Sequence, residues 1–149
     1  QPDKLIGIDL GEKFIRIANE LNEEYFCHNN IQFIFGDFFT YKFELKFDLI
    51  ICFSTFHYFG ERQVVFFSRC REMMNEDAIL LLEVEEYPIN EKPIIDTTAR
   101  SADKKQYHYP NELMMKEFVK GGFIIEDKYA SVKQGGSLYA RCFYKLRKV

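Results

Sequence analysis

Two apolar runs, Phe47–Phe53 (FDLIICF) and Ala78–Val84 (AILLLEV), constrain the fold of this chain most strongly. Each run is short and almost continuously apolar, which is typical of a strand buried on both faces. Between them, after Gly60, apolar residues recur on one side of a helix: Val64, Phe67, Cys70 and Met74. Two doubly buried strands joined by a helix predict neighbouring strands of a parallel sheet.

The N-terminal part of the chain continues this alternation of strands and helices. Lys4–Asp9 and Ile31–Phe35 are short apolar runs that predict strands. A helix is expected between them, from about Glu12 to Asn22, because apolar residues recur there at helical spacing: Phe14, Ile17, Ala18, Leu21 and Tyr25. The polar residues Asn75–Asp77 predict a turn before the second buried strand.

The C-terminal part predicts a helix followed by a hairpin. The helix covers residues 111–120, and Gly121-Gly122 supplies a left-handed cap. Phe123–Ala130 and Ser137–Lys145 are expected to pair antiparallel across the turn residues 134–136. The whole order predicts an α/β fold with a doubly wound, mainly parallel sheet, helices on both faces and this antiparallel hairpin at one edge.

Residues 87–110 interrupt the pattern. The segment is polar, contains Pro88, Pro93 and Pro110 and shows no clear period. Long irregular segments inside a compact domain are usually functional, so we expect an insert or lid near a binding site. The full length of 149 residues otherwise fits a single domain.

Composition excludes several classes of function. No apolar run approaches the roughly 20 residues of a membrane helix, so no membrane partner is expected. The four cysteines lie far apart without a CxxC spacing, so no metal site is expected, and Cys52 and Cys70 predict buried free thiols in a reducing cytoplasm. The net charge of −3 argues against a dedicated nucleic-acid coat, although not against a local basic patch.

The first two predicted strands end in acids. Ligands of parallel sheets bind outside the carboxyl ends of the strands. Asp9 is placed there to accept hydrogen bonds from a ribose diol, or alternatively to cap the next helix. Gly36-Asp37-Phe38 is suited to gripping a purine with a carboxylate and a ring, or alternatively forms a turn beside a core phenylalanine.

The third and fourth predicted strands also end in polar residues. Beyond Phe53-Ser54 lie His57, the best-placed titratable group, and Tyr58. A histidine beside an apolar run is more often structural than catalytic, and both interpretations stay open. Glu83, Glu85 and Glu86 either line an acceptor pocket or are solvated.

Two further groups are of interest. His108 stands between Tyr107 and Tyr109 in the insert and is a candidate contact for a site covered by that segment. The C-terminal cations are expected to form an exposed face and tail, with an anion or RNA contact as the alternative: Arg141, Lys145, Arg147 and Lys148.

Taken together, these segments resemble the class I S-adenosylmethionine-dependent methyltransferases, from that family's second strand to its end. IGIDLGEKFIRIANE is similar to the second strand, its terminal acid and the next helix, and IQFIFGDFF to the third strand with its adenine-side Gly-Asp. KFDLIICFSTFHYFG through AILLLEV is similar to the fourth strand, helix and fifth strand, and YPNELMMKEFVKGGFIIEDK to the late helix and sixth strand. Nearly all of the chain is covered, and the resemblance implies a Rossmann-like fold.

The resemblance implies S-adenosylmethionine as the cofactor. Asp9 would bind its ribose hydroxyls, and Leu10 would pack near the adenine. Asp37 would accept the adenine amine, with Gly36 before it and Phe38 flanking the ring.

The resemblance also implies a reaction site at the third strand end. Phe53 and Ser54 would line the methionine and sulfonium end, and His57 and Tyr58 would lie near the transferring methyl group as catalytic residues. Candidate contacts for the methyl acceptor follow the fourth strand and end the insert: Glu83, Glu85, Tyr107, His108 and Tyr109.

One part of the family pattern is missing. The family's first strand, with its glycine-rich loop, normally lies between the strands that match Lys4–Asp9 and Phe47–Phe53. A sheet without it would have unpaired backbone in its core. We therefore expect the natural protein to extend upstream by about 30–60 residues. A sheet that pairs these strands directly, or a strand from another chain, are alternatives.

The function expected from the resemblance is methyl transfer to a small molecule. His57 would act as base if the acceptor is a hydroxyl, whereas a ring nitrogen or carboxylate needs no strong base. The insert mixes cations and aromatics (Arg100, Lys104, Lys105) and is loosely similar to RNA-modifying members, so an RNA substrate is one alternative. A degenerate binding or scaffold subunit is another, whereas a dinucleotide oxidoreductase lacks GxGxxG. The oligomeric state is not predicted.

Overall fold

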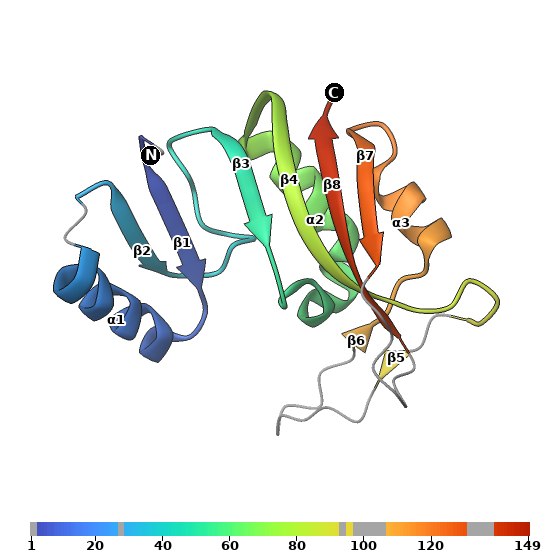
Figure 1. Cartoon of the computed structure of the whole chain (residues 1–149), viewed down its shortest axis with the longest axis horizontal. Coiled ribbons are helices and arrows are strands. Elements are labelled where there is room, and N and C mark those ends of the chain that lie inside the picture. The colour runs from blue at the N-terminus through green and yellow to red at the C-terminus, as the bar shows by residue number, and fades with distance from the viewer. Residues whose placement is uncertain (1–2, 27–28, 93–94, 97–106, 131–138) are drawn as a thin grey trace. The chain divides into compact units, whose positions relative to one another are not determined.

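The computed structural model describes residues 3–26, 29–92, 95–96, 107–130 and 139–149. The chain divides into two compact units, Gln1–Phe43 and Glu44–Val149, called here the N-terminal unit and the C-terminal unit (Figure 1). No described helix is long and apolar enough to cross a bilayer.

The N-terminal unit is one strand–helix–strand motif. It consists of β1 (Leu5–Asp9), α1 (Glu12–Leu21), the π-helical turn η1 (Asn22–Phe26) and β2 (Ile31–Phe35). The strands β1 and β2 pair in parallel and form a sheet of their own. The elements predicted from the apolar periodicity of this segment are therefore confirmed.

The helix α1 is amphipathic but little covered. It starts after Gly11, whose backbone N–H donates to the Asp9 side chain. Phe14 and Leu21 on its apolar face are 67% and 45% exposed. None of its residues is buried. The helix contacts β1 and β2, but this pair of strands covers its apolar face only in part.

The C-terminal unit contains the larger sheet. Its elements are β3 (Phe47–Cys52), η2 (Phe56–Arg62), α2 (Gln63–Met73), β4 (Met74–Glu86), β5 (Ile95–Asp96), β6 (Tyr107–His108), α3 (Glu112–Val119), β7 (Phe123–Ala130) and β8 (Ala140–Lys148). Four strands pair in the order β3-β4-β8-β7, and β5 and β6 form a small separate pair (Figure 1). The two apolar runs are parallel neighbours, as predicted. The prediction of burial on both faces is wrong for β3, none of whose residues is buried, because β3 is the edge strand of this described sheet.

The larger sheet is mixed rather than mainly parallel. The strand β8 lies between β4 and β7 and runs antiparallel to both. It is described from Ala140 to Lys148 and so runs past the predicted end at Lys145, while the predicted start at Ser137 lies outside the described residues. The residues between β7 and β8 include the predicted turn 134–136, which lies outside the described residues. The α/β character is thus as expected, while two of the three pairings in this sheet are antiparallel.

The turn predicted at Asn75–Asp77 is wrong. These residues belong to β4, which already begins at Met74. The Asn75 side chain donates to Asp48 Oδ1 at 2.7 Å, which ties this polar segment to β3. Asp77 adopts a left-handed backbone with φ of 58°, so the strand is irregular there without ending.

The predicted buried face of α2 is also partly wrong. The helix begins at Gln63, after Gly60 with its positive φ of 54°. Its buried residues are Gln63, Phe66, Phe67, Cys70 and Met73. Val64 is exposed, and Met74 belongs to β4. The phase differs because the buried Phe56 packs edge-on against Phe66 and Phe67, with ring centroids 5.5 and 5.6 Å apart.

The core of the C-terminal unit lies on one face of this sheet. Alternate residues of β4 and β8 are buried there: Leu80, Leu82, Val84, Cys142, Tyr144 and Leu146. The helices α2 and α3 contact each other and the strands β4 and β7 respectively. Gly121 ends the α3 segment with φ of 77°, as the predicted left-handed cap requires. Val84 and Cys142, which pair with each other, extend this core to the carboxyl end of β4.

Candidate functional site

Asp9 and Asp37 follow the carboxyl ends of two paired strands in the N-terminal unit. Asp9 lies opposite Phe35 in the register, and Gly36 N–H donates to the Asp9 carbonyl at 3.0 Å. The Asp9 carboxylate accepts the Gly11 N–H at 2.6 Å. Gly11, not Asp9, is the N-cap of α1, and Asp9 instead closes the turn before it. The exposed carboxylate is therefore held at the strand end.

Asp37 organises the turn after β2. Its Oδ1 accepts the Phe39 N–H at 2.9 Å, and its carbonyl accepts the Tyr41 N–H at 2.8 Å. Phe38 is partly buried and packs edge-on against Phe39 at 5.4 Å between centroids. Leu10, beyond β1, is mostly exposed. The local turn expected as the alternative role of Asp37 is present, and it fixes the direction of the carboxylate.

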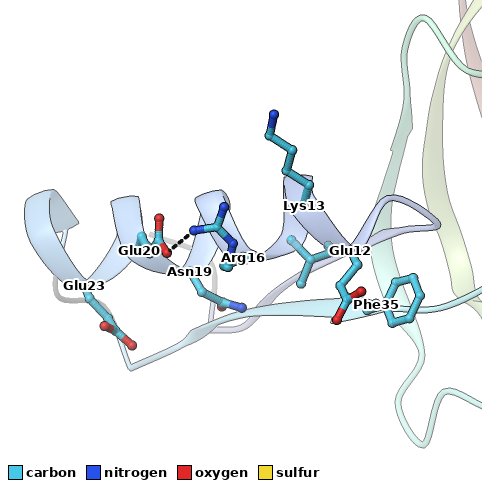
Figure 2. Close-up of a pocket in the computed structure, with 8 residues that line it drawn as sticks. Glu12, Lys13, Arg16, Asn19, Glu20, Glu23 and Phe35 are labelled. Atoms are coloured by element: carbon cyan, nitrogen blue, oxygen red, sulfur yellow. Dashed lines mark hydrogen bonds and ion pairs between the residues drawn. The ribbon is translucent and has the colours of Figure 1, made fainter.

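The N-terminal unit also has an open hollow of about 600 Å³ along α1 (Figure 2). Its lining is Glu12, Lys13, Ile15, Arg16, Asn19, Glu20, Glu23 and Phe35. Arg16 and Glu20 in this lining form an ion pair of 2.7 Å. The charges are mixed in sign, and none of the predicted site residues lines the hollow.

The turn after β3 in the C-terminal unit is tightly bonded to β4. Ser54 N–H and Oγ–H both donate to Glu83 Oε2, at 2.9 and 3.0 Å. The other oxygen of Glu83 lies 3.1 Å from Arg141 Nη1. Thr55 Oγ1–H donates to the Phe53 carbonyl at 2.9 Å. These bonds join the ends of three strands, β3, β4 and β8.

His57 lies in the first turn of η2, with its side chain 14% exposed. Its Nδ1 is 3.7 Å from Glu85 Oε2, and its ring centroid lies 4.1 Å from that of Tyr58. Burial lowers the pKa of His57, the negative charge of Glu83 opposes this, and Arg141 lowers the pKa further. A lowered pKa favours the neutral imidazole, which has a lone pair that can accept a proton.

The structure therefore brings together five predicted residues at the carboxyl ends of β3 and β4. They are Ser54, His57, Tyr58, Glu83 and Glu85. Both glutamates are buried rather than solvated. Phe53 lies just past β3 and packs edge-on against Phe143 at 5.7 Å.

The ends of the predicted insert are partly described. The strand β6 pairs with β5 and lies beside η2, so the backbone of Tyr107 and His108 is near the element that carries His57. The side chains of Tyr107 and His108 lie outside the described residues, as do Arg100, Lys104 and Lys105. Tyr109 is buried and stacks on Tyr139 with centroids 4.7 Å apart.

A buried polar cluster around Glu86 was missed by the sequence analysis. Glu86 Oε1 accepts from the Tyr144 hydroxyl, and its Oε2 accepts from Cys142 Sγ at 3.2 Å and Lys128 Nζ at 2.7 Å. Burial and Glu86 raise the pKa of Cys142 to about 12 and raise that of Tyr144 as well. Side chains alternate between the two faces of a strand, so Glu86 points to the opposite face from Glu83 and Glu85. This alternation could have predicted that Glu86 has a different environment.

The C-terminal cations form ion pairs instead of a free tail. Lys148 is buried in β8 and its Nζ donates to the Met74 carbonyl at 2.8 Å. Arg147 and Lys145 both pair with Glu126, at 2.5 and 2.9 Å. The predicted exposed face is confirmed in part, since the Lys145 side chain is 49% exposed. The predicted tail is wrong, because antiparallel pairing with β4 and β7 carries the strand almost to its last residue.

The sequence of this chain was compared with protein families and with curated proteins. A family model described as a methyltransferase domain matches residues 1–77. No match was found among curated protein sequences.

Several solved structures share the fold at low sequence identity. The 1,6-didemethyltoxoflavin-N1-methyltransferase of Burkholderia thailandensis, with S-adenosylhomocysteine bound, has a TM-score of 0.72 and 15% identity, covering 97% of this chain and 61% of its own. An O-methyltransferase of a polyketide multienzyme from Brevibacillus brevis has a TM-score of 0.75 and 14% identity, and the match covers 97% of this chain and 58% of that protein. An S-adenosylmethionine-dependent methyltransferase from Clostridium acetobutylicum has a TM-score of 0.70 and 14% identity, and the match covers 97% of this chain and 74% of that protein. The chain thus spans about three fifths of the length of the first two proteins.

Proposed function

The chain belongs to the methyltransferase domain family, and we propose that it transfers a methyl group from S-adenosylmethionine to a small-molecule acceptor. One observation carries this proposal. The family match over residues 1–77 includes Asp9 and Asp37, and these carboxylates follow the ends of two paired parallel strands. Ligands of parallel sheets bind at that edge.

Asp9 fits the ribose of the cofactor. Its side chain is exposed, and the bond from Gly11 fixes one carboxylate oxygen. An ionised carboxylate offers about four acceptor positions, so this bond is compatible with a vicinal diol on the same group. The turn role and the ligand role of Asp9 therefore do not compete.

Residues 36–38 fit the adenine. The bond from Phe39 N–H holds the carboxylate of Asp37, which is proposed to accept the exocyclic amine. Gly36 is proposed to lie beside the base, Phe38 to flank its ring and the exposed Leu10 to pack against it. Stacking of this kind contributes about 1–3 kcal/mol per base.

The strand ends of the C-terminal unit are proposed to serve the reacting groups. S-adenosylmethionine supplies a methyl group on a sulfonium, and the protein chiefly aligns the partners, an effect that can contribute about 7–11 kcal/mol. Phe53 and Ser54 are proposed to line the methionine end. The neutral imidazole of His57 takes the proton of a hydroxyl acceptor, and Tyr58 positions that acceptor.

Glu85, Tyr107, His108 and Tyr109 are proposed to contact the acceptor, with residues 87–110 as a lid. The side chain of Glu85 is buried beside His57, with 3.7 Å between Oε2 and Nδ1. This distance is too long for a hydrogen bond to the neutral ring. A protonated imidazole would attract this carboxylate, and a hydrogen bond formed between them would stabilise the protonated base.

A small acceptor is favoured over RNA by the pairing of cations on β8. Within the described residues, Arg141 pairs with Glu83, and Lys145 and Arg147 pair with Glu126. A cation that contacts phosphate would first have to give up its carboxylate partner, which weakens the contact. The toxoflavin methyltransferase among the similar structures also has a small-molecule acceptor bound.

The test is a calorimetric titration of the chain with S-adenosylmethionine and S-adenosylhomocysteine. We expect dissociation constants in the micromolar range, about −8 kcal/mol, and loss of binding in Asp9→Ala. Glu24→Ala, an exposed acid of the same unit, is the matched control and should bind as the wild type does. Unchanged affinity in Asp9→Ala would refute the ribose contact, and absence of wild-type binding would refute the activity for this chain.

A further inference from the structure

Ser54 has an unusual backbone conformation. It follows β3 directly and has φ of 52°, in the left-handed region that residues with a Cβ seldom adopt. Among described non-glycine residues only Asp77 shares a positive φ. Such conformations persist only where the surrounding structure holds them, and they often occur at functional sites.

Glu83 is the group that holds Ser54. A single carboxylate oxygen, Oε2, accepts both the N–H and the hydroxyl of Ser54, at 2.9 and 3.0 Å. The side chain of Glu83 is only 6% exposed. In this setting water competes weakly for the bonds, and hydrogen bonds to a charged group are the stronger kind.

Arg141 holds the second oxygen of the same carboxylate. Its Nη1 lies 3.1 Å from Glu83 Oε1. The three residues come from the end of β3, from β4 and from β8, which are neighbours in one sheet (Figure 1). Both oxygens of the Glu83 carboxylate are thus held, one by Ser54 after β3 and the other by Arg141 of β8.

We propose that Glu83 is a positioning residue, which holds Ser54 in its left-handed conformation and so directs the chain from β3 into η2. That direction places Ser54 and His57 at the reaction site. The inference rests on the proposed function, because Ser54 is assigned there to the methionine end of the cofactor. It replaces the expected acceptor contact of Glu83, because this carboxylate is buried and its three bonds go to Ser54 and Arg141.

The substitution Glu83→Gln tests this role with little change in shape. A carboxamide has one acceptor oxygen and one donor nitrogen. If its oxygen faces Ser54, its NH₂ faces the Arg141 guanidinium, and if it is reversed, the NH₂ faces the two Ser54 donors. In either orientation the side chain loses its bonds to one partner, either Ser54 or Arg141.

The first measurement is the affinity for S-adenosylhomocysteine in a double-mutant cycle. We expect Glu83→Gln to weaken binding about tenfold with Ser54 in place, but less than about threefold in a Ser54→Gly background. Glycine adopts positive φ without strain and needs no partner to hold it there. Equal losses in both backgrounds, or no loss in either, would overturn the proposal.

Two further variants guard against a general loss of stability. Arg141→Gln removes an exposed partner and should weaken binding in the same direction by a smaller factor. Glu126→Gln breaks a carboxylate with two ion pairs on the same sheet and should leave the affinity unchanged. Weakening by Glu126→Gln as large as that by Glu83→Gln would show that only stability is being measured, and would overturn the proposal.

The second measurement is amide hydrogen exchange at Ser54, which needs no ligand. We expect Glu83→Gln to speed exchange there at least about tenfold relative to amides of the β7–β8 pairing. Unchanged protection would overturn the positioning role. If the wild type fails to bind S-adenosylhomocysteine while the exchange result is as expected, the proposed function fails and the hold of Glu83 on Ser54 stands.

Discussion

The two units of this chain contain the same strand–helix–strand motif with very different burial. In the C-terminal unit, β3-α2-β4 is part of a sheet of four strands, and Leu80 and Leu82 are completely buried. In the N-terminal unit, β1-α1-β2 forms only a pair of strands, and no residue of α1 is buried. The same order of strand, helix and strand thus gives the same elements but not the same core, because a helix face is covered only where enough strands lie beside it.

The comparison is tested most strongly by one leucine from each unit. Leu82→Ala should destabilise the protein by about 2–5 kcal/mol, because it empties a fully buried position of β4. Leu21→Ala, on the exposed face of α1, should cost less than about 1 kcal/mol. Urea unfolding of both variants gives the two values. A loss at Leu21 as large as that at Leu82 would show that the apolar face of α1 is covered in solution.

A pair of glutamates gives a smaller contrast of the same kind. Glu86→Gln should cost about 1–3 kcal/mol, because the buried carboxylate accepts from Tyr144, Cys142 and Lys128. Glu20→Gln breaks the exposed Arg16–Glu20 pair of α1 and should cost about 0.3–0.5 kcal/mol. Thermal and urea unfolding at neutral pH measure both. Equal costs would contradict the difference in burial between the units.

The smallest expected effect is a pH dependence from His57. Burial lowers its folded pKa below the ordinary 6.5. As pH falls through 6.5, the unfolded chain takes up a proton that the folded state resists, so stability falls. Above that pH the group contributes no slope.

The variant His57→Gln should remove this part of the slope. Its unfolding free energy should fall less than that of the wild type between about pH 7.5 and 5.5. Glu112 and Glu126 also have lowered pKa values, but these change the stability only below their ordinary pKa of 4.5. They therefore do not contribute to the slope between about pH 7.5 and 5.5. Identical slopes for the two proteins would show that His57 is solvated.

Local features of the fold and site were predictable from the sequence. The strand–helix–strand order, the positive φ of Gly121 and the acids after β1 and β2 all follow from neighbouring residues. The site roles of Asp9, Asp37 and His57 remain predictions. The turn at Asn75–Asp77 was wrong because these residues already belong to β4, where a side-chain bond from Asn75 to Asp48, 27 positions away, links this irregular segment to β3.

The sequence by itself determined most of the strands and helices and which polar residues follow the strands, because these depend largely on contacts within a few residues. Tertiary structure decided which faces are buried and which charges meet. Ser54 and Glu83 lie 29 positions apart, and Glu86 and Tyr144 lie 58 apart. Such pairs are set by the order and direction of strands in the sheet, which the apolar pattern of any one strand does not encode.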